Sequence, residues 1–215
     1  MTSTTTYRRP SAGSDVLAFV RQSWAGLRVL LVLTVLLGVG YPLVVTGVAR
    51  LALPWQAAGS LVSVTGEHVT DPDEAVGSLL IGQRFEGEQW FHPRPSAAGD
   101  GYDTHASGGS NLGPLHPELV AAIEERRAAV AAEEGVAPGL VPADALTASA
   151  SGLDPDISPA YAALQVSRVA RARGVTEEQV RALVADATRG RDVGVLGAPR
   201  VDVLELNLAL ETLAP

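Results

Sequence analysis

The feature that most constrains the fold is an uncharged apolar run at residues 29–48. A helix needs about 20 apolar residues to cross ~30 Å of hydrocarbon, so this run predicts one transmembrane helix over 29–48. Arg28 and Arg50 bracket the run, and Trp24 and Trp55 lie just outside it, where the membrane–water interface favours indole rings. The alternatives are a cleaved signal peptide, whose apolar region is only ~7–15 residues long, and a buried helix of a soluble protein.

The arginines around this run predict a single-pass orientation in the cell membrane. Four of them precede the run, and after Arg50 no basic residue occurs until Arg84. The positive-inside rule therefore predicts a cytoplasmic N-terminal tail at residues 1–28 and an extracytoplasmic domain at residues 51–215. That domain contains 23 of the 24 acidic residues and 11 of the 16 arginines, so it has no electrostatic reason to bind nucleic acid.

Small residues and a proline inside the run favour contact with a second helix. Thr34 and Gly38 form a small-xxx-small pair, which lets another helix approach closely. Pro42 frees a backbone carbonyl and tends to kink the helix. We therefore expect Thr34, Gly38 and Pro42 to take part in helix–helix packing in the membrane. Because glycine and proline are common in transmembrane helices, an ordinary lone span surrounded by lipid is the alternative.

The composition excludes several kinds of chemistry. The chain has no cysteine, which excludes disulfides, thiolate metal sites and cysteine nucleophiles. It has no lysine, which excludes the phosphate-binding lysine of a P-loop and Schiff-base catalysis. Motifs of zinc proteases, serine hydrolases and EF-hands are absent, and the four histidines lack metal-ligand spacing. We expect no catalytic residues and no metal site, although an anchored hydrolase that uses a Ser-rich loop is a competing hypothesis.

Residues 51–215 predict an α+β fold that contains a small sheet and about four helices. Short apolar runs bounded by glycine predict strands at 60–64 and 78–81. A Gly/Pro/Ser-rich stretch at 91–117 has no helical period, and a loop of this length is usually functional or disordered. The residues after it predict four helices, at 117–134, 159–173, 176–189 and 201–213.

Capping signals set most of these helix boundaries. Ser158-Pro159 is an N-cap followed by a helix-starting proline, and residues 176–179 form a capping box. Glycines at 135, 174 and 190 are expected to end the first three helices. The segment 201–213 fits both the alternation of a strand and the period of a helix. Its leucines favour a helix, so we expect a helix there.

Several Gly- and Ser-rich stretches in this domain are more specific than ordinary loops. They are FHPRPSA at 91–97, SGGSNLGP at 107–114 and TASASGLDPDISP at 147–159. These stretches resemble the KdpC family of the Kdp-type potassium-transporting ATPase, as do further matches at Tyr41-Pro42, 58–60, 77–83, 165–170 and 197–207. The resemblance runs from about residue 29 to the C-terminus. The chain departs from the family pattern at Asp202, where the family usually has asparagine, and at Asp156.

This resemblance implies an accessory role in ATP-driven, high-affinity potassium uptake. The implied partners are a channel-like potassium-binding subunit and a P-type subunit that hydrolyses ATP. Members of the family are described as assembly factors, and as catalytic chaperones that raise the ATP-binding affinity of the hydrolysing subunit. A glutamine is implicated in nucleotide contact, and the matching residue here is Gln165. The chain lacks the DKTGT phosphorylation motif, so it is expected to be non-catalytic, with no tightly bound cofactor and with ATP reached only in a complex with the hydrolysing subunit.

The implied nucleotide contact conflicts with the orientation that the arginines predict. ATP is cytoplasmic, whereas the positive-inside rule places Gln165 outside. An acidic outer domain that holds subunits together and concentrates cations suits the predicted location better. A membrane-anchored, extracytoplasmic binding module without a pump partner is the remaining alternative.

Overall fold

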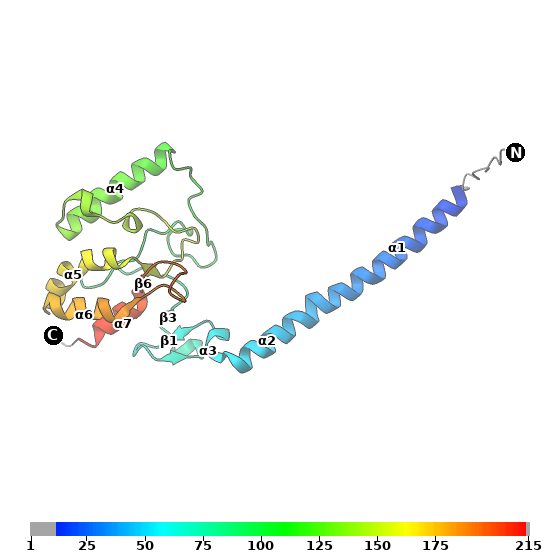
Figure 1. The fold of residues 1–215 in the computed structure, drawn as a ribbon, viewed down its shortest axis with the longest axis horizontal. Coiled ribbons are helices and arrows are strands. Elements are labelled where there is room, and N and C mark those ends of the chain that lie inside the picture. Colours follow the sequence, from blue (N-terminus) through cyan, green and yellow to red (C-terminus); the bar gives the residue numbers. More distant parts are fainter. Residues whose placement is uncertain (1–11, 214–215) are drawn as a thin grey trace. The chain divides into compact units, whose positions relative to one another are not determined.

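The computed structural model describes residues 12–213, and the chain forms two compact units, residues 1–57 and 58–215. The first unit is one unbroken helical rod: α1 (Ala12–Val35), a π-helical turn (Leu36–Gly40) and α2 (Tyr41–Ala52), followed by the short α3 (Pro54–Ala57) (Figure 1). Within this rod, Asp15–Ala52 is long and apolar enough to cross a membrane. The expected long apolar helix near the N-terminus is therefore confirmed. Residues 1–11 of the predicted tail lie outside the described part.

The π-helical turn has a local cause. Pro42 has no backbone N–H, and its ring excludes the carbonyl one turn earlier, that of Gly38. A wider turn relieves this clash, and Tyr41 accordingly donates its N–H to the carbonyl of Leu36, five residues back. The helix also begins at Ala12, well before the predicted start of the span. The residues expected to form a polar tail are therefore helical from 12 to 28.

The second unit contains two small antiparallel sheets. The first has the order β2 (His68–Val69), β1 (Leu61–Val62), β3 (Gly77–Ser78). The second has the order β4 (Asp156–Ile157), β6 (Arg200–Asp202), β5 (Thr188–Arg189). The strands predicted at 60–64 and 78–81 were too long, and most of 78–81 forms a turn instead. Strands of two or three residues carry no visible alternation, which is why four of the six were not predicted.

The second unit contains four α-helices, as the sequence predicted. They are α4 (Pro117–Glu134), α5 (Pro159–Arg173), α6 (Glu177–Ala187) and α7 (Val203–Glu211). Gly135 and Gly174 adopt φ of +66° and +68° and end α4 and α5. The last two helices are shorter than predicted, because Thr188 enters β5 and residues 200–202 form β6 before α7 begins. Single turns of 3₁₀-helix lie at Pro72–Glu74, Pro138–Leu140 and Ala143–Ala145.

The hydrophobic core of this unit is built around α5. Figure 1 shows α5 between α4 on one side and α6 and α7 on the other. Val166 and Val169 of α5, Val180 of α6, and Leu206 and Leu210 of α7 are all at most 2% exposed. Phe91, from the predicted loop, is fully buried in the same cluster. The N-terminal end of the loop at 91–117 is therefore part of the core.

Residues 96–108 of that loop are bonded to the stretch at 147–159. Gly108 donates its N–H to the carbonyl of Ser151 at 2.8 Å, and the Ser96 hydroxyl donates to the carbonyl of Gly152 at 2.6 Å. Gly152 has φ +66°, and a Cβ there would lie 2.7 Å from the backbone nitrogen of Ala98. Only glycine allows this approach without a shift. Residues 96–108 and 149–152 therefore pack together although neither segment forms a helix or a strand.

Candidate functional site

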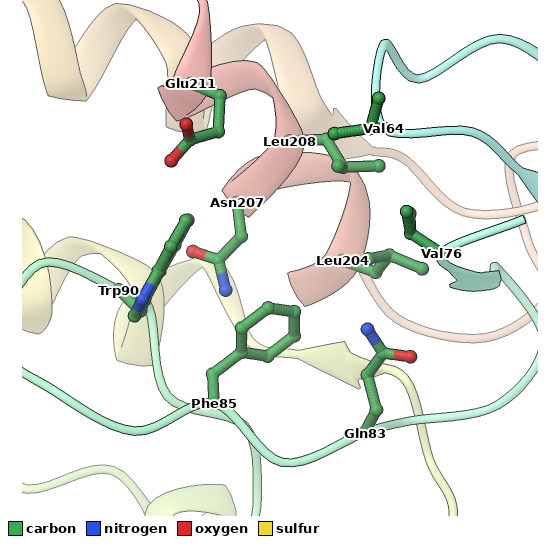
Figure 2. Close-up of a pocket in the computed structure, with 9 residues that line it drawn as sticks. All are labelled: Val64, Val76, Gln83, Phe85, Trp90, Leu204, Asn207, Leu208 and Glu211. Carbon is green, nitrogen blue, oxygen red and sulfur yellow. The ribbon is translucent and has the colours of Figure 1, made fainter.

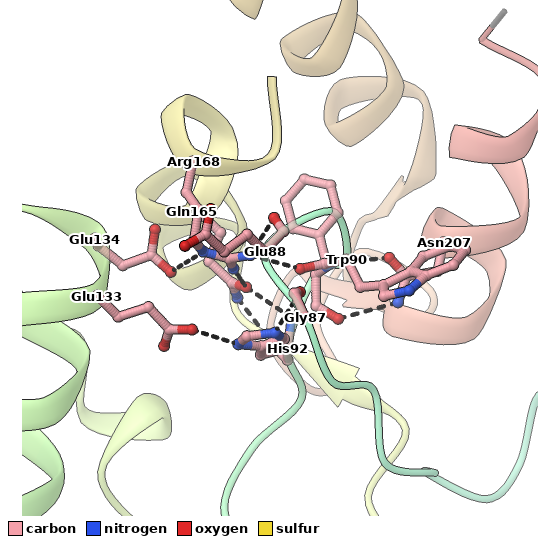
Figure 3. Close-up of polar contacts among 10 residues, drawn as sticks. Gly87, Glu88, Trp90, His92, Glu133, Glu134, Gln165, Arg168 and Asn207 are labelled. Carbon is pink, nitrogen blue, oxygen red and sulfur yellow. Dashed lines mark hydrogen bonds and ion pairs between the residues drawn. The ribbon is translucent and has the colours of Figure 1, made fainter. Parts of the chain in front are cut away.

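Side-chain amides from two helices hold one irregular segment, Gly87–His92, which we call the clamped segment (Figure 3). Phe91 donates its N–H to Oδ1 of Asn207 at 2.9 Å, and Nδ2 of Asn207 donates to the carbonyl of Phe91 at 3.0 Å. Asn207 lies on α7 and is 1% exposed. This amide therefore satisfies both backbone groups of a fully buried residue, as a neighbouring strand does in a sheet.

Gln165 repeats this arrangement on the next residue. His92 donates its N–H to Oε1 of Gln165 at 2.7 Å, and Nε2 of Gln165 donates to the carbonyl of His92 at 3.0 Å. Arg168, one turn further along α5, donates to the same Oε1 at 2.8 Å. Gln165 is fully buried. The residue implicated in nucleotide contact therefore has its amide bonded within the domain and has no exposed surface.

Arg168 connects the clamped segment to α4. Its Nη1 donates to the carbonyls of Glu88 and Trp90 at 2.7 and 2.9 Å, and its Nε donates to Oε1 of Glu134 at 2.9 Å. The side chains of Arg168 and Glu134 are 2% and 1% exposed. Burial raises the pKa of Glu134, and the facing guanidinium opposes that rise. Breaking a buried pair leaves an uncompensated charge, so we expect Arg168 and Glu134 to be needed together.

Two further contacts complete the clamp. Arg173 donates from Nε to the carbonyl of Gln89 at 2.8 Å and places its guanidinium 4.5 Å from the centre of the Trp90 ring. The imidazole Nδ1 of His92 lies 3.2 Å from Oε1 of Glu133 on α4. Every carbonyl from residue 88 to 92 therefore accepts a hydrogen bond from a side chain of α5 or α7.

The clamp shapes an apolar groove beside it (Figure 2). The groove has a volume of about 290 Å³ and is lined by Val64, Val76, Gln83, Phe85, Trp90, Leu204, Asn207, Leu208 and Glu211. Phe85 and Trp90 form one wall with ring centres 6.0 Å apart, and Leu204 and Leu208 of α7 form another. Its lining fits an apolar side chain and contains no nucleophile with a base beside it.

The structure divides the predicted site residues between the two units. Thr34, Gly38 and Pro42 lie on the helical rod, and Gln165 lies on α5 of the second unit. The sequence did not indicate Asn207 or Glu134, because each acts on residues distant in the chain. In the part of the chain that the structure describes, no three His, Asp or Glu side chains are grouped as metal ligands.

Asp202 positions the helix that carries Asn207. Its Oδ1 accepts the N–H of Glu205 at 2.8 Å and so caps α7. It is 1% exposed, and its Cα is paired with that of Asp156 across the β4–β6 ladder. Burial raises the pKa of Asp202 to about 7, and the nearby Asp156 carboxylate adds to the rise. Burial also raises the pKa of Asp156.

Comparison with known proteins identifies one family. Residues 23–212 match the family described as KdpC: K+-transporting ATPase, c chain. The protein named Potassium-transporting ATPase KdpC subunit in Kineococcus radiotolerans is 60% identical over 196 residues, which cover 91% of this chain and 96% of that protein. Proteins of the same name in Beijerinckia indica and Koribacter versatilis are 51% and 50% identical, and in each case cover 86% of this chain and 91% of the relative.

Replacing Asn207 with alanine should destabilise the second unit. The N–H and carbonyl of Phe91 would lose their partners in a buried site, which costs about 2–4 kcal/mol of unfolding free energy. Urea titration of the purified chain in mild detergent, followed by tryptophan fluorescence, measures this change. Gln89→Ala is the matched control, because its side chain is exposed on the same segment, and should change the free energy by less than ~0.5 kcal/mol. Equal effects of the two variants would contradict the clamp.

Asp202→Asn should flatten the pH dependence of stability. Between the unfolded pKa of 3.8 and the folded pKa of about 7, the folded chain keeps a proton that the unfolded chain has lost. The wild-type free energy of unfolding should therefore fall as pH rises through this window, by about 1–3 kcal/mol from this residue. Asparagine keeps the capping oxygen but has no proton to lose. A wild-type slope in the variant, measured by urea titration from pH 4 to pH 8, would exclude this role for Asp202.

Proposed function

The chain belongs to the KdpC family of potassium-transporting ATPase subunits, and from this premise we propose that it is a non-catalytic accessory subunit needed for assembly and stability of the pump. One observation carries the proposal: the match extends over the membrane helix and the second unit alike. Its partners are then a channel-like potassium-binding subunit and a P-type subunit that hydrolyses ATP. The groove and the membrane helix offer separate contact surfaces for them.

In the membrane, the proposed contact face contains Thr34, Gly38 and Pro42. The helix surface at Gly38 is open: a Cβ added there would have only the Thr34 methyl carbon Cγ2 nearby, at 3.9 Å. A partner helix can approach such a face closely, and lipid covers the remainder of the rod.

The second part of the proposal concerns ATP. As a catalytic chaperone, the subunit would raise the ATP-binding affinity of the hydrolysing subunit, and Gln165 would contribute through the clamped segment. The geometry supports this indirect route, because the amide of Gln165 is buried and bonded to the backbone of His92. Direct contact with a nucleotide would first require residues 87–92 to leave the amide.

The location also belongs to the proposal. The arginine asymmetry around the helix favours a cytoplasmic N-terminus and an extracytoplasmic second unit. An effect on ATP binding would then pass through partner subunits across the membrane. The acidic unit could in addition concentrate cations near the ion entrance. The competing function is an anchored binding module with no pump partner.

Purification of the tagged chain in mild detergent tests the function. A stoichiometric complex with potassium-stimulated ATPase activity is expected, and a chain that extracts alone would support the binding module.

In the complex, Gln165→Ala should weaken apparent ATP affinity by about threefold or more, a change of ~0.7 kcal/mol. Asn207→Ala loosens the same segment without touching Gln165, and Gln89→Ala serves as the control. A loss of ATP affinity in both Gln165→Ala and Asn207→Ala supports the indirect route through the clamped segment. A loss confined to Gln165→Ala supports direct contact with the nucleotide. Wild-type affinity in both variants would exclude a role of Gln165 in ATP binding.

Labelling of single cysteines tests the location. The chain has no cysteine, so His105→Cys in the exposed loop gives a unique site. A membrane-impermeant maleimide added to intact cells whose outer wall has been opened should label it. Labelling only in inverted membrane vesicles would reverse the proposed orientation.

A further inference from the structure

The helical rod is longer than a bilayer is thick. The part able to cross a membrane, Asp15–Ala52, has 38 residues. At 1.5 Å per residue it measures roughly 57 Å, against ~30 Å of hydrocarbon, and even a tilt of ~40° leaves roughly 44 Å. The uncharged run at 29–48 fits the hydrocarbon. Residues 15–28 therefore extend about 20 Å beyond it as helix.

This extension is amphipathic. At 100° per residue, one side gathers an apolar stripe, which we call the N-terminal stripe: Val16, Phe19, Val20, Trp24 and Leu27. Ser23 is the one polar residue on that side, and Leu17 lies at its edge. The other side gathers Ala18, Gln22 and Asp15, and Arg21 and Arg28 lie between the two sides. The stripe residues are 40–69% exposed in the structure, from Leu27 at 40% to Phe19 at 69%. Held straight out into water, the stripe would leave five large apolar side chains unburied.

The surroundings of the stripe match a phospholipid surface. Arg21 and Arg28 lie two turns apart along its edge, where guanidinium groups reach lipid phosphates while the apolar side faces the acyl chains. Trp24 lies within the stripe with the Arg28 guanidinium 5.6 Å from its ring centre, and indole rings favour the headgroup layer. The stripe is also joined covalently to the membrane span, so it is always close to the bilayer surface.

We propose that residues 15–27 lie in the phospholipid headgroup layer on the N-terminal side of the membrane, with the N-terminal stripe turned toward the acyl chains. In the structure α1 continues through Gly26 without a break. Glycine is the weakest helix former of the extension, and no atom lies within 4 Å of the place that its Cβ would occupy. A bend at Gly26 lowers the extension onto the bilayer.

The test compares cysteines on the two sides of the extension in the full chain, which has no cysteine of its own. Val20→Cys is on the stripe and Gln22→Cys is on the polar side; Val16→Cys and Ala18→Cys form a second pair. Each variant is placed in nanodiscs of phosphatidylcholine with a minority of phosphatidylglycerol and treated with a water-soluble maleimide. The proposal predicts that the stripe cysteine of each pair reacts at least about fivefold more slowly than its partner.

The two pairs also distinguish the alternatives. In a helix that projects straight from the bilayer, residue 22 lies nearer the lipid than residue 20, and residue 18 nearer than residue 16. Equal rates in both pairs, or slower reaction of the polar-side cysteines, would therefore overturn the proposal. Protection of the stripe that is absent from the chain alone and occurs only in the assembled complex would overturn it too, because a partner protein would then cover the stripe.

Discussion

The second unit depends on two side-chain amides that bond the backbone of a neighbouring segment, as an adjacent strand does in a sheet. Gln165 and Asn207 each bond the N–H and the carbonyl of one residue in a segment that has no regular partner. Without Asn207, Phe91 could not enter the core with its backbone groups satisfied, because buried N–H and carbonyl groups need partners. Gln165 does the same for His92. These four bonds fix the position of a segment between helices α5 and α7, and the walls of the adjacent groove follow from that position.

The same network explains why charged residues occur so deep in the unit. Arg168 neutralises Glu134 and at the same time satisfies two carbonyls of the clamped segment. A guanidinium has five N–H donors in a fixed plane, so one side chain can bond the Gln165 amide, the carbonyls of the clamped segment and the Glu134 carboxylate together. One oxygen of Glu134, Oε2, has no hydrogen-bond partner in the described part of the chain. A network of this kind favours one arrangement of its elements and tolerates little substitution.

The sequence predicted features that depend on neighbouring residues and missed those that depend on distant ones. The boundaries of α4 and α5 followed from Pro117, Ser158, Gly135 and Gly174, whose effects act within one turn. Four of the six short strands in the described residues were missed, because their pairing is set by the fold and not by alternation. Gln165 was named through resemblance alone; its partner His92 is 73 residues away, and no local pattern joins them. The stripe at residues 16–27 was readable from helical periodicity, but the charges around it favoured interpretation as a polar tail.

Hydrogen exchange at the backbone amides of Phe91 and His92 tests this account most directly. Both residues lie in a segment without helix or strand, yet both N–H groups donate to a buried side-chain amide. The account predicts that these two amides exchange as slowly as the core amides of α5, because both require the unit to open. Exchange as fast as that of the exposed residues Glu86 and Glu88 would contradict it, since the segment would then move independently of α5 and α7.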